Sequence, residues 1–199
     1  MARPRASGRD KYPRAPAGQA GRGEGGTKLT DAAAIRARGK TIVKALRRVG
    51  DSTNHPPRMD SKEDRIRLQK LVYLLRAGGY GPARKFNFNL YMNGPYSPDL
   101  AEVYYQFEET GVVDAAPTGD IPTTLLGEVV DADRKGVVFL EALATALDLT
   151  ISLRQKGAGR AALGAGLKWA ESIKPQIPKD TWGEVRSFLQ THPVLAGST

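Results

Sequence analysis

The segment from Ser61 to Gly79 constrains the fold more than any other, because it has the pattern of a capped amphipathic helix. Asp64 follows Ser61 at the spacing of a capping box, in which the two residues satisfy each other's main-chain N–H groups. Gly78 and Gly79 end the pattern. A helix with one apolar face needs other elements to cover it, so the rest of the chain must build a core around this segment. The apolar side chains recur at i, i+3, i+4 and i+7, on Leu68, Leu71, Val72 and Leu75.

Five further helices are predicted from caps, apolar spacing and terminating glycines. In chain order they run from Thr30 to Arg48, from Ser97-Pro98 to Gly111, from a cap at Asp133 towards Leu153, over residues 160–173, and onward from Pro178 with Trp182, Val185 and Leu189 facing inward. Together with the helix at Ser61, these segments cover most of the chain. The fold class predicted is therefore mainly α.

A change of period after Lys85 predicts a half-buried strand over residues 85–92. The next four residues, 93–96, have the composition of a turn. Val112-Val113 has the pattern of a short strand, residues 114–122 that of a loop, and residues 125–130 fit either a strand or a helix. The expected inward set of the long strand alternates with Asn87, Asn89 and Tyr91 and consists of Phe86, Phe88, Leu90 and Met92.

The charge of the chain is concentrated at its N-terminus. The whole sequence has a formal net charge of +9, whereas residues 1–50 alone carry thirteen basic and three acidic side chains, a net of +10. Residues 51–199 are therefore close to neutral. The first 27 residues consist mainly of Arg, Gly, Pro, Ala and Ser, a composition too poor in apolar surface to offset the entropy of ordering.

These observations predict one compact helical domain with a small β element, preceded by a disordered basic tail. The boundaries expected are 1–28 for the tail, 29–49 for a basic amphipathic helix, 50–60 for a linker and 61–190 for the helical domain. A domain of this size is large enough to bury a single core.

Composition also restricts the chemistry that the chain can perform. The sequence contains no cysteine, which excludes disulfides, thiolate metal sites and a cysteine nucleophile. Its two histidines, His55 and His192, each precede a proline in segments expected to be a linker and a frayed end, so neither is placed as a general base or in a metal cluster. The carboxylates follow solvent-facing spacings and form no evident acid–base pair. We expect a non-enzymatic, cytoplasmic protein with no cofactor and no membrane-spanning segment.

The sequence around the Ser61 helix and the following turn is similar to a known family. The run from Arg67 to Leu75 includes Leu-Gln-Lys-Leu-Val-Tyr, an aromatic strand follows, and Tyr91-Met92-Asn93-Gly94-Pro95-Tyr96-Ser97-Pro98 leads to Tyr104 in the next helix. This pattern resembles the SocA-like Panacea domain and the related YwgA-type proteins. The similarity extends over about residues 61–190, and its specific part is Leu68 to Tyr104.

The resemblance implies a mostly helical fold and an antitoxin that neutralises a partner toxin by direct binding or by presenting it to a protease. The family carries no agreed catalytic residues, so none is transferred. Tyrosine is a favoured interface anchor as well as a core filler, and Tyr105 lies off the apolar face of its helix. The candidate partner contacts are Lys70, Tyr73, Tyr91, Tyr96 and Tyr105. The oligomeric state is left open.

The basic N-terminus supports an alternative, a nucleic-acid-binding accessory or regulatory protein. Basic side chains recur at near-helical spacing after the arginine- and glycine-rich tail, and such arms neutralise phosphates without reading sequence. The same residues could instead bind an acidic protein or keep the tail soluble. The candidate nucleic-acid contacts are Arg36, Lys40, Lys44 and Arg47.

A glycine motif near residue 157 does not indicate a dinucleotide site. Residues 157–162 formally match G-x-G-x-x-A, and Asp180 follows about twenty residues later. That fingerprint requires a buried strand running directly into the glycines, whereas here residues 154–156 are polar and follow an expected helix. A pair of glycines that ends a helix explains the pattern more simply.

Overall fold

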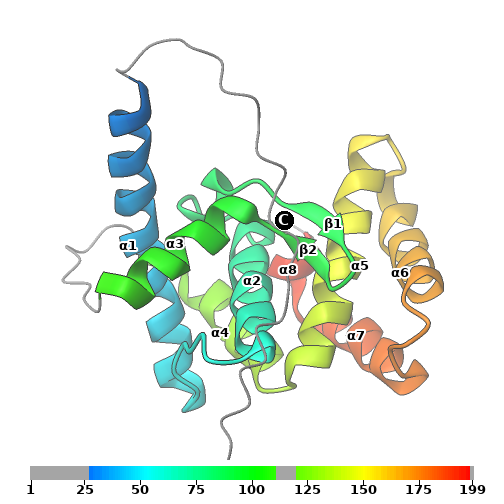
Figure 1. Ribbon diagram of the computed structural model, residues 1–199. Coiled ribbons are helices and arrows are strands. Elements are labelled where there is room, and N and C mark those ends of the chain that lie inside the picture. The colour runs from blue at the N-terminus through cyan, green and yellow to red at the C-terminus, as the bar shows by residue number, and fades with distance from the viewer. Residues whose placement is uncertain (1–26, 111–119, 198–199) are drawn as a thin grey trace, which may run out of the picture.

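The computed structural model describes residues 27–110 and 120–197, which form a mainly helical body with one small β-hairpin (Figure 1). The predicted fold class is confirmed for this part of the chain. The elements are α1 (Thr27–Thr53), α2 (Lys62–Ala77), η1 (Ala83–Lys85), β1 (Asn89–Tyr91), β2 (Gly94–Tyr96), α3 (Pro98–Thr110), α4 (Thr123–Asp133), α5 (Val137–Gln155), η2 (Gly159–Ala161), α6 (Ala162–Ile173), α7 (Lys179–Thr191) and α8 (Pro193–Ala196).

Helices α2 and α5 form the centre of the body, and the other elements surround them (Figure 1). The predicted capping box of α2 is present: the Asp64 N–H donates to the Ser61 hydroxyl, and the Ser61 N–H donates to the Asp64 carboxylate. Every residue of α2 from Arg67 to Leu75 is buried, polar ones included. Because α2 is covered on all sides at this level, its polar side chains must find partners inside the protein.

Helix α1 extends past its predicted end at Arg48 and takes in the first part of the predicted linker. Gly50 does not break the helix. A Cβ at this position would lie 2.9 Å from the His55 carbonyl oxygen, so the glycine instead allows the chain to fold back closely against α1. Asn54, with φ of 55°, provides the left-handed residue that ends α1. The buried side chains of Ile42, Leu46 and Val49 make α1 part of the common core.

The predicted strand over residues 85–92 is replaced by an η1 turn and a two-stranded antiparallel hairpin. Residues 94–96, predicted as a turn, form the second strand, and Met92-Asn93 is the actual turn. Phe86 is buried as expected, whereas Leu90 and Met92 are 38% and 84% exposed. The alternation fails at these two residues because the hairpin packs on the body through Gly94 and Pro95 of β2, which leaves the side chains of β1 and the turn exposed.

Asp133 was predicted to cap α5, but it lies at the end of α4. Helix α5 starts instead at Val137, and the preceding Gly136 has no side chain that could cap it; residues 125–130 are helical. The Asp133 carboxylate is buried and pairs with Arg67 on α2. The predicted helix cap at Asp133 is therefore wrong, because its carboxylate pairs with Arg67 of α2.

Helix α7 has its predicted inward face, and one further helix follows it. Trp182, Val185 and Leu189 of α7 are buried, as predicted. The segment after His192, expected to be a frayed end, forms the short helix α8 with Leu195 buried in the core. The carboxylate of Glu128 on α4 accepts the first main-chain N–H groups of this helix.

The predicted disordered tail lies outside the described residues, apart from Thr27 and Lys28, which begin α1. The predicted Val112-Val113 strand also lies outside them. Within residues 27–110 and 120–197, no helix combines the length and the apolarity required to cross a bilayer.

Candidate interaction surface

Three polar side chains of α2 hold the hairpin against the body, and Gln69 makes the most direct connection. Its side-chain oxygen accepts the Ser97 N–H at 2.9 Å, and its side-chain nitrogen donates to the Ser97 carbonyl at 3.0 Å. The same nitrogen lies 3.2 Å from the Tyr104 hydroxyl. Ser97 in turn accepts the Leu100 N–H, which confirms its predicted place at the start of α3. One amide thus fixes the junction between β2 and α3.

Lys70 holds the middle of β2. Its ammonium nitrogen lies 2.7 Å from the Pro95 carbonyl oxygen, and the side chain is only 1% exposed. Burial lowers the pKa of Lys70 to about 7, an effect that Glu141 opposes and Lys174 reinforces. Either protonation state can donate to the carbonyl, so the connection to β2 is kept when the proton is lost.

Lys174, the residue after α6, holds the hairpin turn. Its ammonium group donates to the Met92 carbonyl and lies 2.9 Å from a Glu141 carboxylate oxygen. Lys174 is 3% exposed, so this ion pair is largely shielded from water. The turn is therefore bonded to α6, and Glu141 links the same lysine to α5.

Tyr73 supports the residues that precede β1. Its hydroxyl donates to Asp148 of α5 at 2.9 Å, and its ring meets Phe88 edge-on at a centroid distance of 5.2 Å. Burial, followed by the charge of Asp148, raises the pKa of Tyr73 well above its usual value. Burial also raises the pKa of Asp148, against the opposing hydrogen bond from Tyr73. Lys70 and Tyr73, predicted as partner contacts, are thus enclosed in the core and offer no exposed contact surface.

The tip of the hairpin remains exposed on this rigid support. We define the hairpin surface as Leu90, Tyr91 and Met92, which are 38%, 53% and 84% exposed. Tyr91 packs edge-on against Tyr96, with 5.5 Å between ring centroids. Helix α6, whose end is bonded to the turn, carries two further exposed apolar side chains, Trp169 and Ile173. Apolar side chains gathered on a projecting turn are typical of a protein contact surface.

The predicted tyrosine set is only partly brought together. Tyr91 and Tyr96 lie side by side on the hairpin, whereas Tyr105 lies on α3, which leads away from the hairpin towards α1 (Figure 1). Tyr105 is 50% exposed and packs against Tyr104. The sequence did not single out Gln69 as a structural link, although its place inside the family-like motif was a signal that it has a specific role.

The basic side chains of α1 form a second exposed feature. Lys40, Lys44 and Arg47 are exposed and make no ion pair with the described residues. The side chain of Arg36, the fourth predicted contact, lies outside the described part of the chain. We call Lys40, Lys44 and Arg47 the basic face of α1.

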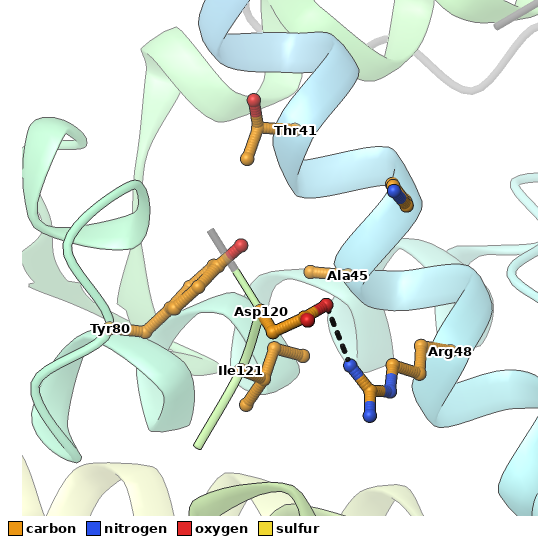
Figure 2. A pocket seen from close by; sticks show the side chains of 7 residues that line it. Thr41, Ala45, Arg48, Tyr80, Asp120 and Ile121 are labelled. Carbon is orange, nitrogen blue, oxygen red and sulfur yellow. Dashed lines mark hydrogen bonds and ion pairs between the residues drawn. The ribbon is translucent and has the colours of Figure 1, made fainter. Parts of the chain in front are cut away.

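A small hollow adjoins this basic face (Figure 2). Arg48 at its edge pairs with Asp120 at 3.1 Å, and both side chains are well exposed to solvent. Burial, followed by the charge of Asp120, raises the pKa of the Tyr80 hydroxyl. The hollow contains a single carboxylate, and within the described residues no group of three His, Asp or Glu side chains could hold a metal ion. Its lining consists of Thr41, Lys44, Ala45, Arg48, Tyr80, Asp120 and Ile121.

Comparisons with protein-family models, with curated proteins and with solved structures found no match to this chain.

Proposed function

We propose that the protein is a non-enzymatic antitoxin that neutralises a partner toxin by binding it directly through the hairpin surface. The observation that carries this proposal is an exposed apolar tip, Leu90 to Met92, mounted on a fully hydrogen-bonded internal support. A contact surface that is rigid before binding loses little conformational entropy when the partner arrives. The hairpin is therefore well suited to act as a preformed docking element.

The resemblance to the Panacea domain supplies the toxin part of the proposal, and the internal contacts make that resemblance more informative. Gln69 and Lys70 of the helical half of the motif bind Ser97 and Pro95 of the turn half. The two halves of the sequence pattern thus form one structural unit, in which α2 supports the hairpin and the hairpin surface is the outer part. This arrangement explains why the pattern contains polar residues that face the interior.

Replacing both Tyr91 and Met92 by alanine should reduce partner binding at least a hundredfold and leave the protein folded. Both side chains are more than half exposed, so their loss removes anchors from the interface and little from the core. The test is growth of cells that express the product of the flanking gene together with each variant, and recovery of the complex by affinity purification.

Tyr105→Ala is the matched control, because Tyr105 is exposed to a similar extent but lies on α3. It should protect cells as well as the wild type does. The antitoxin proposal fails if the flanking product is harmless and does not co-purify. Equal protection by the double variant and the control would instead show that the hairpin surface is not the binding site.

We propose nucleic-acid binding through the basic face of α1 as a second function. Three exposed cations on one helix, none of which forms an ion pair with a described residue, favour it, because each can neutralise a phosphate and release a counterion. Removal of α1 is not a suitable test, since Ile42, Leu46 and Val49 belong to the core. Point variants on the exposed face avoid this difficulty.

Replacing Lys40, Lys44 and Arg47 by alanine should weaken binding to a 20-nucleotide single-stranded DNA by about tenfold or more at low salt, and should flatten its salt dependence. Fluorescence anisotropy between 50 and 200 mM salt measures both. The control variant removes the same charge from three exposed cations in the C-terminal half of the chain. It carries alanine at Lys156, Arg160 and Lys168. Equal effects of the two triple variants would mean that net charge alone determines the affinity.

A further inference from the structure

The register of the hairpin determines which main-chain groups point away from it. Leu90 lies opposite Pro95, between the pairs Asn89–Tyr96 and Tyr91–Gly94. In an antiparallel ladder, pairs that exchange two hydrogen bonds alternate with pairs that exchange none. Proline has no N–H to give, so Leu90–Pro95 is the pair without hydrogen bonds. The main-chain groups of both residues therefore point outward, on opposite edges of the hairpin.

The outer edge of β2 is already occupied. The outward carbonyl of Pro95 accepts the hydrogen bond from Lys70 of α2, as this register requires. Proline leaves no second main-chain group unsatisfied on that edge. The body of the protein thus takes the place of a third strand on this side.

The outer edge of β1 is open. All three residues of β1 are exposed, and within the described residues no hydrogen bond reaches the outward N–H or carbonyl of Leu90. At the turn, the Met92 carbonyl is already bonded to Lys174. Any strand added to this edge would therefore run from Leu90 back towards Phe88 and η1, away from the turn. An open donor–acceptor pair of this kind is what an added strand uses.

Cations lie on η1 and α2, next to the residues towards which an added strand would run. Arg84 and Lys85 of η1 are exposed, and the guanidinium of Arg76 lies 5.9 Å from the centre of the Phe88 ring. None of the three forms an ion pair with a described residue. Asp148 lies near Arg76, but its carboxylate accepts the hydrogen bond from Tyr73. The surroundings of the edge are thus complementary to a segment with acidic side chains.

We infer that the partner protein adds an extended acidic segment as a third strand along β1, pairing its main chain with Leu90 and placing carboxylates near Arg76, Arg84 and Lys85. This inference rests on the proposed partner-binding function and specifies its geometry. The apolar side chains of the hairpin surface then flank the added strand. The partner segment alternates acidic and β-branched residues, so that its carboxylates lie on the face of β1 that carries Phe88 and Arg76 and its apolar side chains on the face that carries Tyr91.

Leu90→Pro tests the main-chain contact, because it removes the outward N–H but no hydrogen bond between β1 and β2. The probe is a fluorescein-labelled ten-residue peptide of alternating Glu and Val, with the Lys/Val peptide as its charge control. Fluorescence anisotropy should show the wild type binding the Glu/Val peptide at least tenfold more tightly than the Lys/Val peptide. The affinity of Leu90→Pro for the Glu/Val peptide should fall at least tenfold. The affinity of Leu90→Val, which keeps the N–H, should stay within threefold of the wild type.

Replacing the Leu90 N–H by an ester oxygen removes the same donor without introducing a proline ring. This ester variant should show the same loss of affinity for the Glu/Val peptide, and it thereby controls for local distortion by proline. Circular dichroism and the melting temperature establish that each variant is folded. The strand-addition inference would be overturned if the wild type and the ester variant bound the Glu/Val peptide equally well. It would also be overturned if the wild type bound the Glu/Val and Lys/Val peptides equally well. Capture of the flanking gene product by Leu90→Pro but not by the Tyr91/Met92 double variant would leave partner binding intact and reject only strand addition.

Discussion

Replacing Asp133 by alanine should lower the free energy of unfolding by about 3–5 kcal/mol, because it leaves a buried positive charge without its partner. Arg67 and Asp133 form two parallel hydrogen bonds, of 2.7 and 2.5 Å, and both side chains are at most 3% exposed. The same Nη2 nitrogen also donates to the His55 carbonyl at 2.9 Å. Arg67 thus joins α2 to the end of α4 and to the segment after α1. Urea unfolding followed by circular dichroism measures the loss.

Asp131→Ala provides the matched control for this prediction. Asp131 lies on the same helix, but its side chain is 51% exposed and pairs with the exposed Arg134. An exposed pair contributes about 0–1 kcal/mol, so this variant should remain close to the wild type. The double variant Arg67→Met/Asp133→Leu removes both charges and should recover most of the loss. A single Asp133→Ala variant within about 1 kcal/mol of the wild type would contradict the assigned role of the pair.

The pair also shows why part of this structure could not be predicted from the sequence. Asp133 has the residue type and the position expected of a helix cap, and local rules predict nothing else for it. Its actual partner, Arg67, is 66 residues away. Only the packing of α2 against α4 brings the two together, and packing of that kind is not encoded in local spacing.

The elements with strong local signals were predictable. The capping box at Ser61, the start of α3 at Ser97 and the inward face of α7 all depend on contacts within a few residues. Gly50 shows the limit of such rules, because a glycine ends a helix in one context and permits close packing in another. The difference depends on the segment around His55, which folds back against α1.

The candidate site illustrates the same division. The exposure of Tyr91 follows from its place next to a turn, whereas the burial of Lys70 and Tyr73 depends on α2 being central. A polar face on a helix usually meets water, and partner contacts predicted at Lys70 and Tyr73 would require such an exposed face. In this protein the same face meets the hairpin and α5, where Pro95 and Asp148 provide its hydrogen-bond partners.

Replacing Gly94 by alanine should cost about 2–5 kcal/mol and weaken the support of the hairpin surface. Gly94 has φ of 81°, a conformation that costs an alanine about 1–2 kcal/mol. A Cβ here would also lie 2.7 Å from the Thr145 hydroxyl and 3.3 Å from Cε of Lys70. Overpacking of this kind adds about 1–3 kcal/mol. Urea unfolding measures the loss of stability, and the co-expression assay measures the effect on partner binding.

Two further variants separate the backbone cost from the steric cost at Gly94. Gly157 has φ of 88° but open space around the position of a Cβ, so Gly157→Ala should carry the backbone cost alone. Thr145 donates to the Glu141 carbonyl of its own helix, and Thr145→Ala should by itself be mild. Adding Thr145→Ala to Gly94→Ala should recover the steric part, because the hydroxyl in contact is gone. If the second substitution gives no recovery, the close approach of β2 to α5 does not hold the hairpin in place, and the support of the partner surface must lie in the contacts of Gln69, Lys70 and Lys174.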